Sequence, residues 1–93
     1  MPTAADFRME MYRLMYEAMQ AGENAVEINS GELHTRVGGY PGANHRMPVC
    51  CAVMHGTYAP DAGDVIVEQP PSGQGATLTI RYVLPTPVAA TGA

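Results

Sequence analysis

The chain has 93 residues, which is enough for one hydrophobic core but not for two. Hydrophobic residues make up 46% of it and charged residues 15%, which is typical of a globular protein with few surface charges. The net charge of −4 argues against a generally basic protein that coats DNA, and no apolar run approaches the roughly 20 residues that a membrane span requires.

The first residues and the two cysteines indicate the cellular compartment. The first residues, MPTAADFRMEMYR, are charged early and contain no apolar signal core, so export is not expected. The two cysteines, Cys50 and Cys51, are adjacent and do not form a disulfide framework, which fits a reducing compartment. The sequence therefore predicts a cytoplasmic protein without a membrane partner.

A long helix is expected at the start. Thr3 followed by Asp6 is typical of a capping box, and Gly22 is suited to a left-handed stop, so the helix should run from about Ala4 to Ala21. One apolar arc of this helix holds Phe7, Met11, Leu14, Met15 and Ala18.

This helix carries a second apolar arc beside the first. It consists of Met9, Tyr12, Tyr16 and Met19, and Arg8 lies between the two arcs. A small monomer has difficulty burying both, so we expect the second arc to form a homodimer or partner interface. The alternative is that these side chains are simply exposed singly.

Shorter elements follow. Val26 and Ile28 alternate with Glu27, which favours a very short strand. Ser30 is suited to cap a helix from Gly31 to about Val37, which Gly38 and Gly39 should end.

A third helix of about three turns should begin at Pro48 and end near Gly56. We expect its inward side to hold Val49, Cys50, Val53, Met54 and Thr57. We expect Cys51, Ala52 and His55 to lie toward the other side, with Cys51 as a partly exposed thiol.

The last third predicts a β-hairpin formed by DVIVEQ, a turn and ATLTIRYVL. In its second strand, the inward positions are expected to be Leu78, Ile80, Tyr82 and Leu84. Arg81 on the outward face should pair with Glu68 across the hairpin or contact a phosphate. Residues 85–93 are expected to be a disordered tail.

The order helix, strand, helix, turn, helix and hairpin, from Phe7 to Leu84, resembles a winged helix-turn-helix domain. The stretch SGELHTRVGGYPGANHRMPVCC also resembles the helix-turn-helix core of small bacterial or phage DNA-binding modules. The resemblance implies a single α+β domain over residues 1–84, with three helices and a C-terminal β-hairpin wing. It also implies that the helix near Pro48 is the recognition helix and that residues 70–75 form the wing tip.

Residues 30–60 form the only third of the chain that is not acidic, with a net charge of +1. We therefore expect a small DNA-binding protein that contacts double-stranded DNA through residues 31–57 and the wing, as a transcriptional regulator or a phage or mobile-element accessory factor. The expected contacts are His34, Arg36, Asn44, His45, Arg46, Ser72 and Gln74. For His45, a hydrogen bond that stabilises the turn is equally expected.

A protein–protein interaction module with the same fold is the alternative. The acidic balance, a wing without Arg or Lys, and the Met- and Tyr-rich first helix all favour it. The two hypotheses differ in whether Arg36 and Arg46 face solvent or are neutralised by carboxylates of the same chain.

The residues give little support to metal binding or catalysis. Cys51 and His55 stand four apart and can form half of a zinc site, but the sequence shows no second pair. Neither an orienting group nor oxyanion donors accompany them. We therefore expect no metal, no cofactor and no enzymatic activity.

Overall fold

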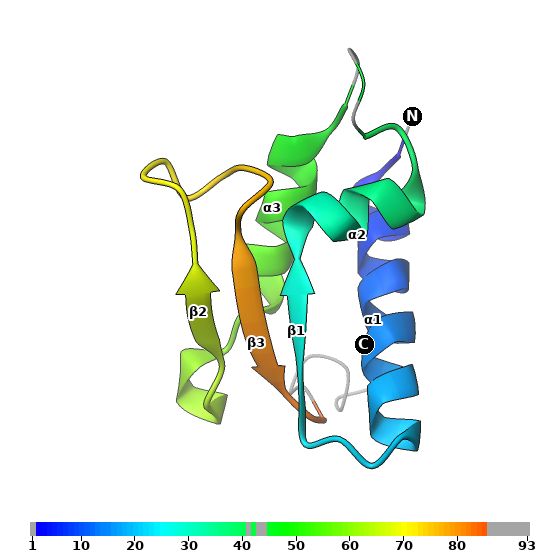
Figure 1. Cartoon of the computed structure of the whole chain (residues 1–93), viewed down its shortest axis with the longest axis vertical. Helices are drawn as coiled ribbons and strands as arrows, with labels where there is room; N and C mark the ends of the chain where they lie inside the picture. Colours follow the sequence, from blue (N-terminus) through cyan, green and yellow to red (C-terminus); the bar gives the residue numbers. More distant parts are fainter. Residues whose placement is uncertain (1, 41, 43–44, 86–93) are drawn as a thin grey trace.

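The computed structural model describes residues 2–40, 42 and 45–85. Within these residues the chain forms an α+β fold of three α-helices and a three-stranded antiparallel sheet (Figure 1). The elements are α1 (Ala4–Gln20), β1 (Ala25–Asn29), α2 (Ser30–Val37), α3 (Met47–Thr57), the 3-10 turn η1 (Pro60–Ala62), β2 (Val65–Glu68) and β3 (Thr79–Val83). This is the element order that the sequence predicts.

The first helix begins and ends as expected. The Thr3 side chain accepts from the backbone N–H of Asp6, and the Asp6 carboxylate accepts from that of Thr3, which completes the capping box. At the other end Gly22 adopts a φ of 83°, a conformation that glycine takes without steric cost. The two predicted end signals of α1 are therefore confirmed.

The sheet has the strand order β1-β3-β2, so the last strand of the chain lies in the middle. Ile28 of β1 pairs with Ile80 of β3, and both are buried under the helices, whereas Glu27 and Arg81 pair on the exposed face. One face of the sheet thus packs on the helices and the other faces solvent.

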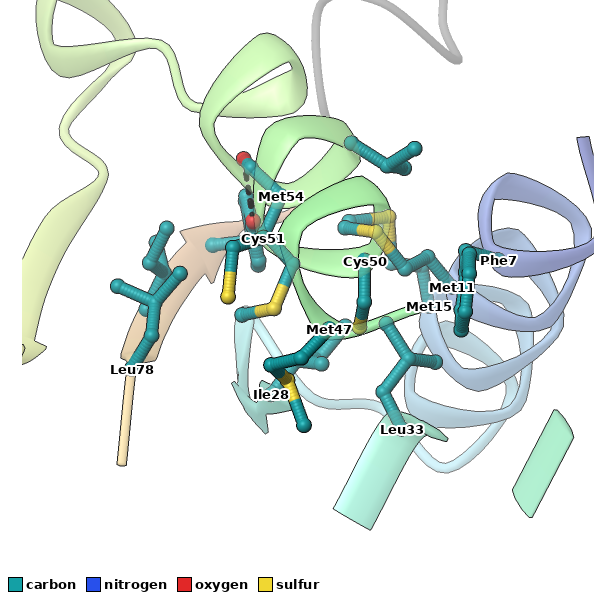
Figure 2. Packing of buried hydrophobic residues seen from close by; sticks show 13 residues of the cluster. Phe7, Met11, Met15, Ile28, Leu33, Met47, Cys50, Cys51, Met54 and Leu78 are labelled. Atoms are coloured by element: carbon teal, nitrogen blue, oxygen red, sulfur yellow. Dashed lines mark hydrogen bonds between the residues drawn. The ribbon is translucent and has the colours of Figure 1, made fainter. Parts of the chain in front are cut away.

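The core lies where the three helices meet this inner face (Figure 2). Its largest fully buried side chains are Phe7, Met11, Leu33, Met54, Leu78, Ile80 and Tyr82. The Tyr82 hydroxyl donates to the Met54 carbonyl at 2.8 Å, so the one polar atom that this ring brings into the core has a partner.

Three local predictions are wrong. Asn29, not Ser30, caps α2, because its side chain accepts from the backbone N–H of Glu32. Arg81 lies opposite Val65 and Glu27 rather than Glu68, because the hairpin register pairs Val65 with Arg81 and Ile66 with Ile80. The second hairpin strand is also shorter than predicted and ends at Val83. Of the predicted tail, only Pro85 lies among the described residues.

Helix α2, the start of α3 and the loop between β2 and β3 gather at one end of the molecule (Figure 1). The turn from α1 into β1 lies at the opposite end (Figure 1). The segments that carry the predicted contact residues are therefore brought together by the fold.

Candidate nucleic-acid interface

Helix α3 has one buried and one exposed face. Residues four apart share a face, and Pro48, Ala52 and Gly56 follow this spacing on the exposed side. The buried residues of α3 are Met47, Cys50, Cys51, Val53, Met54 and Thr57. The helix consequently offers solvent a face without a charged or amide side chain.

The loop that joins β2 to β3, residues 69–78, is held against α3. The ring nitrogen Nε2 of His55 lies 2.8 Å from the carbonyl oxygen of Gly73, and the amide nitrogen of Gly75 lies 3.3 Å from Sγ of Cys51. Cys51 is fully buried, so the prediction of a partly exposed thiol is wrong. Helical periodicity predicts that this side chain points away from the main core, but the loop contacts it through Gly75.

The same loop is also fixed to the start of α2. The Asn29 amide donates to the Ala76 carbonyl at 3.0 Å, and the Ser30 hydroxyl donates to the Gly75 carbonyl. A Cβ at Gly31 would stand 3.0 Å from the Ala76 oxygen, so only glycine allows this close approach without a shift. The loop, α2 and α3 therefore form one ordered unit.

A buried histidine connects the end of α2 to the start of α3. Nε2 of His34 accepts from the backbone N–H of Arg46 at 2.8 Å, and Nδ1 lies 3.0 Å from the Gly38 carbonyl oxygen. These partners correspond to a neutral ring with its proton on Nδ1. The ring also packs at centroid distances of 4.9 Å from Phe7 and 5.4 Å from Tyr40.

His34 is fully buried, with both ring nitrogens engaged. It cannot contact DNA directly, so its prediction as a DNA contact is wrong. Its two hydrogen bonds instead position the start of α3 relative to the end of α2. The neighbouring His45 is exposed, and its Nδ1 accepts from the backbone N–H of Met47 at 3.2 Å, the kind of hydrogen bond that the sequence predicts for this turn. Asn44 lies outside the described residues.

Two arginines lie close to α3, one at its N-terminus and one on the neighbouring helix α1. Arg46 is half-buried at the N-terminus of α3, and Arg8 is exposed on α1. Arg8 and Tyr12 line a groove of about 450 Å³ whose other wall includes Pro48 and Ala52. In the described part of the chain, neither arginine forms an ion pair.

Arg8 was not among the contact residues predicted from the sequence. The signal was present, since this was the one cation between two apolar arcs of the first helix. Its position beside α3, however, depends on how the helices pack.

The remaining helical arginines are partly or fully compensated by carboxylates. Arg13 pairs with Glu10 and Glu17 on α1. The hydrogen bond from Arg13 lowers the pKa of Glu10, and the positive charge of Arg36 acts in the same direction. Arg36 is exposed, but the negative charge of Glu10 partly offsets its positive charge. We therefore expect it to attract an anion less strongly than Arg8 or Arg46.

The predicted wing contacts, Ser72 and Gln74, are both exposed. The Ser72 hydroxyl donates to the Gln74 carbonyl at 2.9 Å and accepts from the Gln74 backbone N–H at 3.3 Å. The hydroxyl therefore shapes the tip of the loop, and the Gln74 amide is the freer of the two groups.

Comparisons with protein-family models, curated proteins and solved structures give no significant match to this chain. The case for a function therefore depends on the chain's own residues.

The cysteines and histidines do not gather into a metal site. Among the described residues, no group of three or more His, Cys, Asp or Glu side chains is placed to hold an ion. Cys50 and Cys51 are both fully buried and point to different sides of α3, Cys50 toward Leu33 and Cys51 toward Leu78 (Figure 2).

Burial makes the Cys50 thiol a source of alkaline instability. It raises the pKa of Cys50 from its ordinary value of 9.0 to about 12. The unfolded thiol ionises above pH 9 while the folded thiol does not, so stability is lost as the pH rises from about 9 to about 12. We expect the free energy of unfolding, measured with urea, to fall by about 1.4 kcal/mol between about pH 8 and about pH 10 on this account. The Cys50→Ala variant should show that much less decline, and an identical pH profile in both proteins would contradict the assignment.

A second surface lies along α1. Met9, Tyr16 and Met19 are 71%, 64% and 44% exposed, as expected for the second apolar arc, and Tyr12 is partly buried against the core. A broad depression of about 1250 Å³ lies beside Met9, with Asp6, Glu10 and Gly39 in its lining. Arg13 also lines it, paired with Glu10. No helix in the described part of the chain is both long and apolar enough to cross a bilayer.

Proposed function

We propose that this chain is a winged helix-turn-helix domain that binds double-stranded DNA, as a small cytoplasmic regulator or accessory factor of bacterial or phage type. In this proposal α3 enters the major groove and the β2–β3 loop acts as the wing. The element order and the β1-β3-β2 sheet support it. They support it as an architecture only, because other α+β proteins can share these features.

The distribution of carboxylates carries the proposal. All nine Asp and Glu residues occur within residues 6–32 and 61–68. Residues 33–60, which include α3 and most of α2, and residues 69–85, which include the wing, have none. Helix α3 and the β2–β3 loop, the two segments offered to DNA in this proposal, therefore carry no acidic side chain, although the whole chain carries −4.

Specific groups in this region suit phosphate. Arg8 lies beside the exposed face of α3 and Arg46 lies at the N-terminus of that helix, and neither forms an ion pair in the described residues. The first turn of α3 has no acidic residue, so no carboxylate of its own offsets the positive end of the helix dipole. Arg36 adds a third, partly compensated cation.

Salt dependence tests the proposal. We expect labelled duplex DNA to bind in a fluorescence anisotropy titration, with log K falling against log salt by about 0.9 for each neutralised phosphate. Three contacts in a monomer should weaken binding about 40-fold between about 50 and 200 mM salt, and six in a dimer about 1,800-fold. The slope therefore also reports the oligomeric state. Absence of binding at about 50 mM salt would contradict the proposal.

The exposed arc of α1 favours a second candidate function. Met9, Tyr16 and Met19 form an apolar stripe that a protein partner can cover, first of all a second copy of this chain. As a homodimer contact it would assist DNA binding by doubling the number of arginines. As a contact with another protein it would make the domain an interaction module instead.

A further inference from the structure

The face of α3 that would meet the base edges has few means of reading them. Pro48, Ala52 and Gly56 carry no hydrogen-bonding side chain atom. Beside them, His55 directs Nε2 to the Gly73 carbonyl of the loop, and Cys51 is buried against Gly75. The polar groups nearest to the exposed face are therefore committed to holding the wing.

A helix in the major groove distinguishes bases by hydrogen bonds or by apolar contact with a pyrimidine 5-methyl group. The exposed face of α3 can supply only the second kind of contact. On the basis of the proposed function, we propose that Pro48 and Ala52 read pyrimidine 5-methyl groups in the major groove.

The surroundings of α3 suit this form of reading. Ala52 and Gly56 are small, so the helix backbone can approach the floor of the groove closely. Arg8 on one side and the docked loop on the other border this face. Phosphate contacts from the borders would set the depth and register of the helix, and the methyl contacts would select the sequence.

Two sources present the same methyl group, thymine and 5-methylcytosine, and base substitution separates them. Duplexes of one sequence are compared with thymine, with uracil in its place, and with uracil plus 5-methylcytosine in place of cytosine. We expect uracil to weaken binding about fourfold for each contacted methyl group, the fold-change that corresponds to burying one such group. This loss would assign the contacts to thymine, whereas equal binding of the thymine and uracil duplexes with tighter binding of the 5-methylcytosine duplex would assign them to modified cytosine. The salt slope should stay the same in all three duplexes.

A variant locates the contact. Ala52→Gly should reduce the ratio of thymine to uracil affinity toward one, whereas Ala21→Gly, the same change at the far end of α1, should keep the wild-type ratio. Circular dichroism checks that both variants are folded, and the comparison of duplexes with the wild-type protein does not depend on either.

The outcomes separate the two proposals. Equal affinity for all three duplexes, with binding intact, would overturn the methyl reading and leave the proposed function standing. Failure to bind any duplex at low salt would overturn both.

Discussion

Replacing Arg8 and Arg46 together by alanine is expected to weaken binding to duplex DNA about 100-fold at low salt, because each change removes a charge-assisted contact worth about a factor of ten. The slope of log K against log salt should also become shallower by about two per protomer. Both side chains are at least partly exposed and form no ion pair in the described residues, so the free energy of unfolding should change little. Anisotropy titrations at several salt concentrations measure both quantities.

The matched control is the Arg13→Ala/Arg81→Ala double variant, which removes the same net charge from other surfaces. Arg13 is already paired with Glu10 and Glu17, and Arg81 lies on the solvent face of the sheet. If the control weakens binding as much as the Arg8/Arg46 variant does, the effect comes from total charge and not from a surface around α3. Arg36→Ala should weaken DNA binding less than the Arg8/Arg46 variant and more than the control, since the negative charge of Glu10 partly offsets that of Arg36.

The His34→Ala change is expected to lower the free energy of unfolding by about 3–4 kcal/mol, a large share of the total for a domain of this size. The ring is fully buried, packs on Phe7 and Tyr40, and joins the Arg46 amide to the Gly38 carbonyl. Removing it leaves a cavity and two unpaired polar groups. Urea denaturation followed by circular dichroism measures the loss.

Two further variants separate packing from hydrogen bonding at this position. His34→Phe fills the space but cannot accept from Arg46 or donate to Gly38, so it should still cost about 2 kcal/mol. His45→Ala removes an exposed ring and one backbone contact and should cost less than about 1 kcal/mol. A His34→Phe variant as stable as the wild type would show that the two hydrogen bonds do not fix the start of α3.

Much of the fold follows from local patterns. The Thr3–Asp6 capping box and Gly22 define α1, and the alternation of Leu78, Ile80 and Tyr82 identifies the buried face of the last strand. Each of these signals lies within a few residues of the feature that it predicts. The α+β class and the order of elements can therefore be read directly from the chain.

The errors share a long-range cause. Cys51 is buried because residues 73–75, far along the chain, return over α3, and helical periodicity carries no information about that loop. Asn29 rather than Ser30 caps α2, since the Ser30 hydroxyl is drawn to Gly75 in the same loop. Arg81 lies opposite Val65 instead of Glu68, and the long loop between β2 and β3 leaves this register undetermined by the neighbouring residues.

The candidate site was predicted only in part. The turn that contains His45 and Arg46, and Pro48 after them, predict that both residues lie just before α3. Both are at least partly exposed there. The role of Arg8 depends on how α1 packs beside α3, and the burial of His34 depends on the aromatic rings of Phe7 and Tyr40. The positions of Arg8 and His34 thus depend on contacts between separate helices and loops, which local sequence patterns do not reveal.

The most direct test of the central claim is where duplex DNA touches the protein. In a titration of ¹⁵N-labelled protein with a short duplex, we expect the backbone amide signals of residues 45–56, residues 69–76 and Arg8 to shift together and to recover when salt is added. Shifts confined to the exposed stripe of α1 around Met9, Tyr16 and Met19, or no shifts at low salt, would contradict DNA binding through α3 and favour a protein-interaction module.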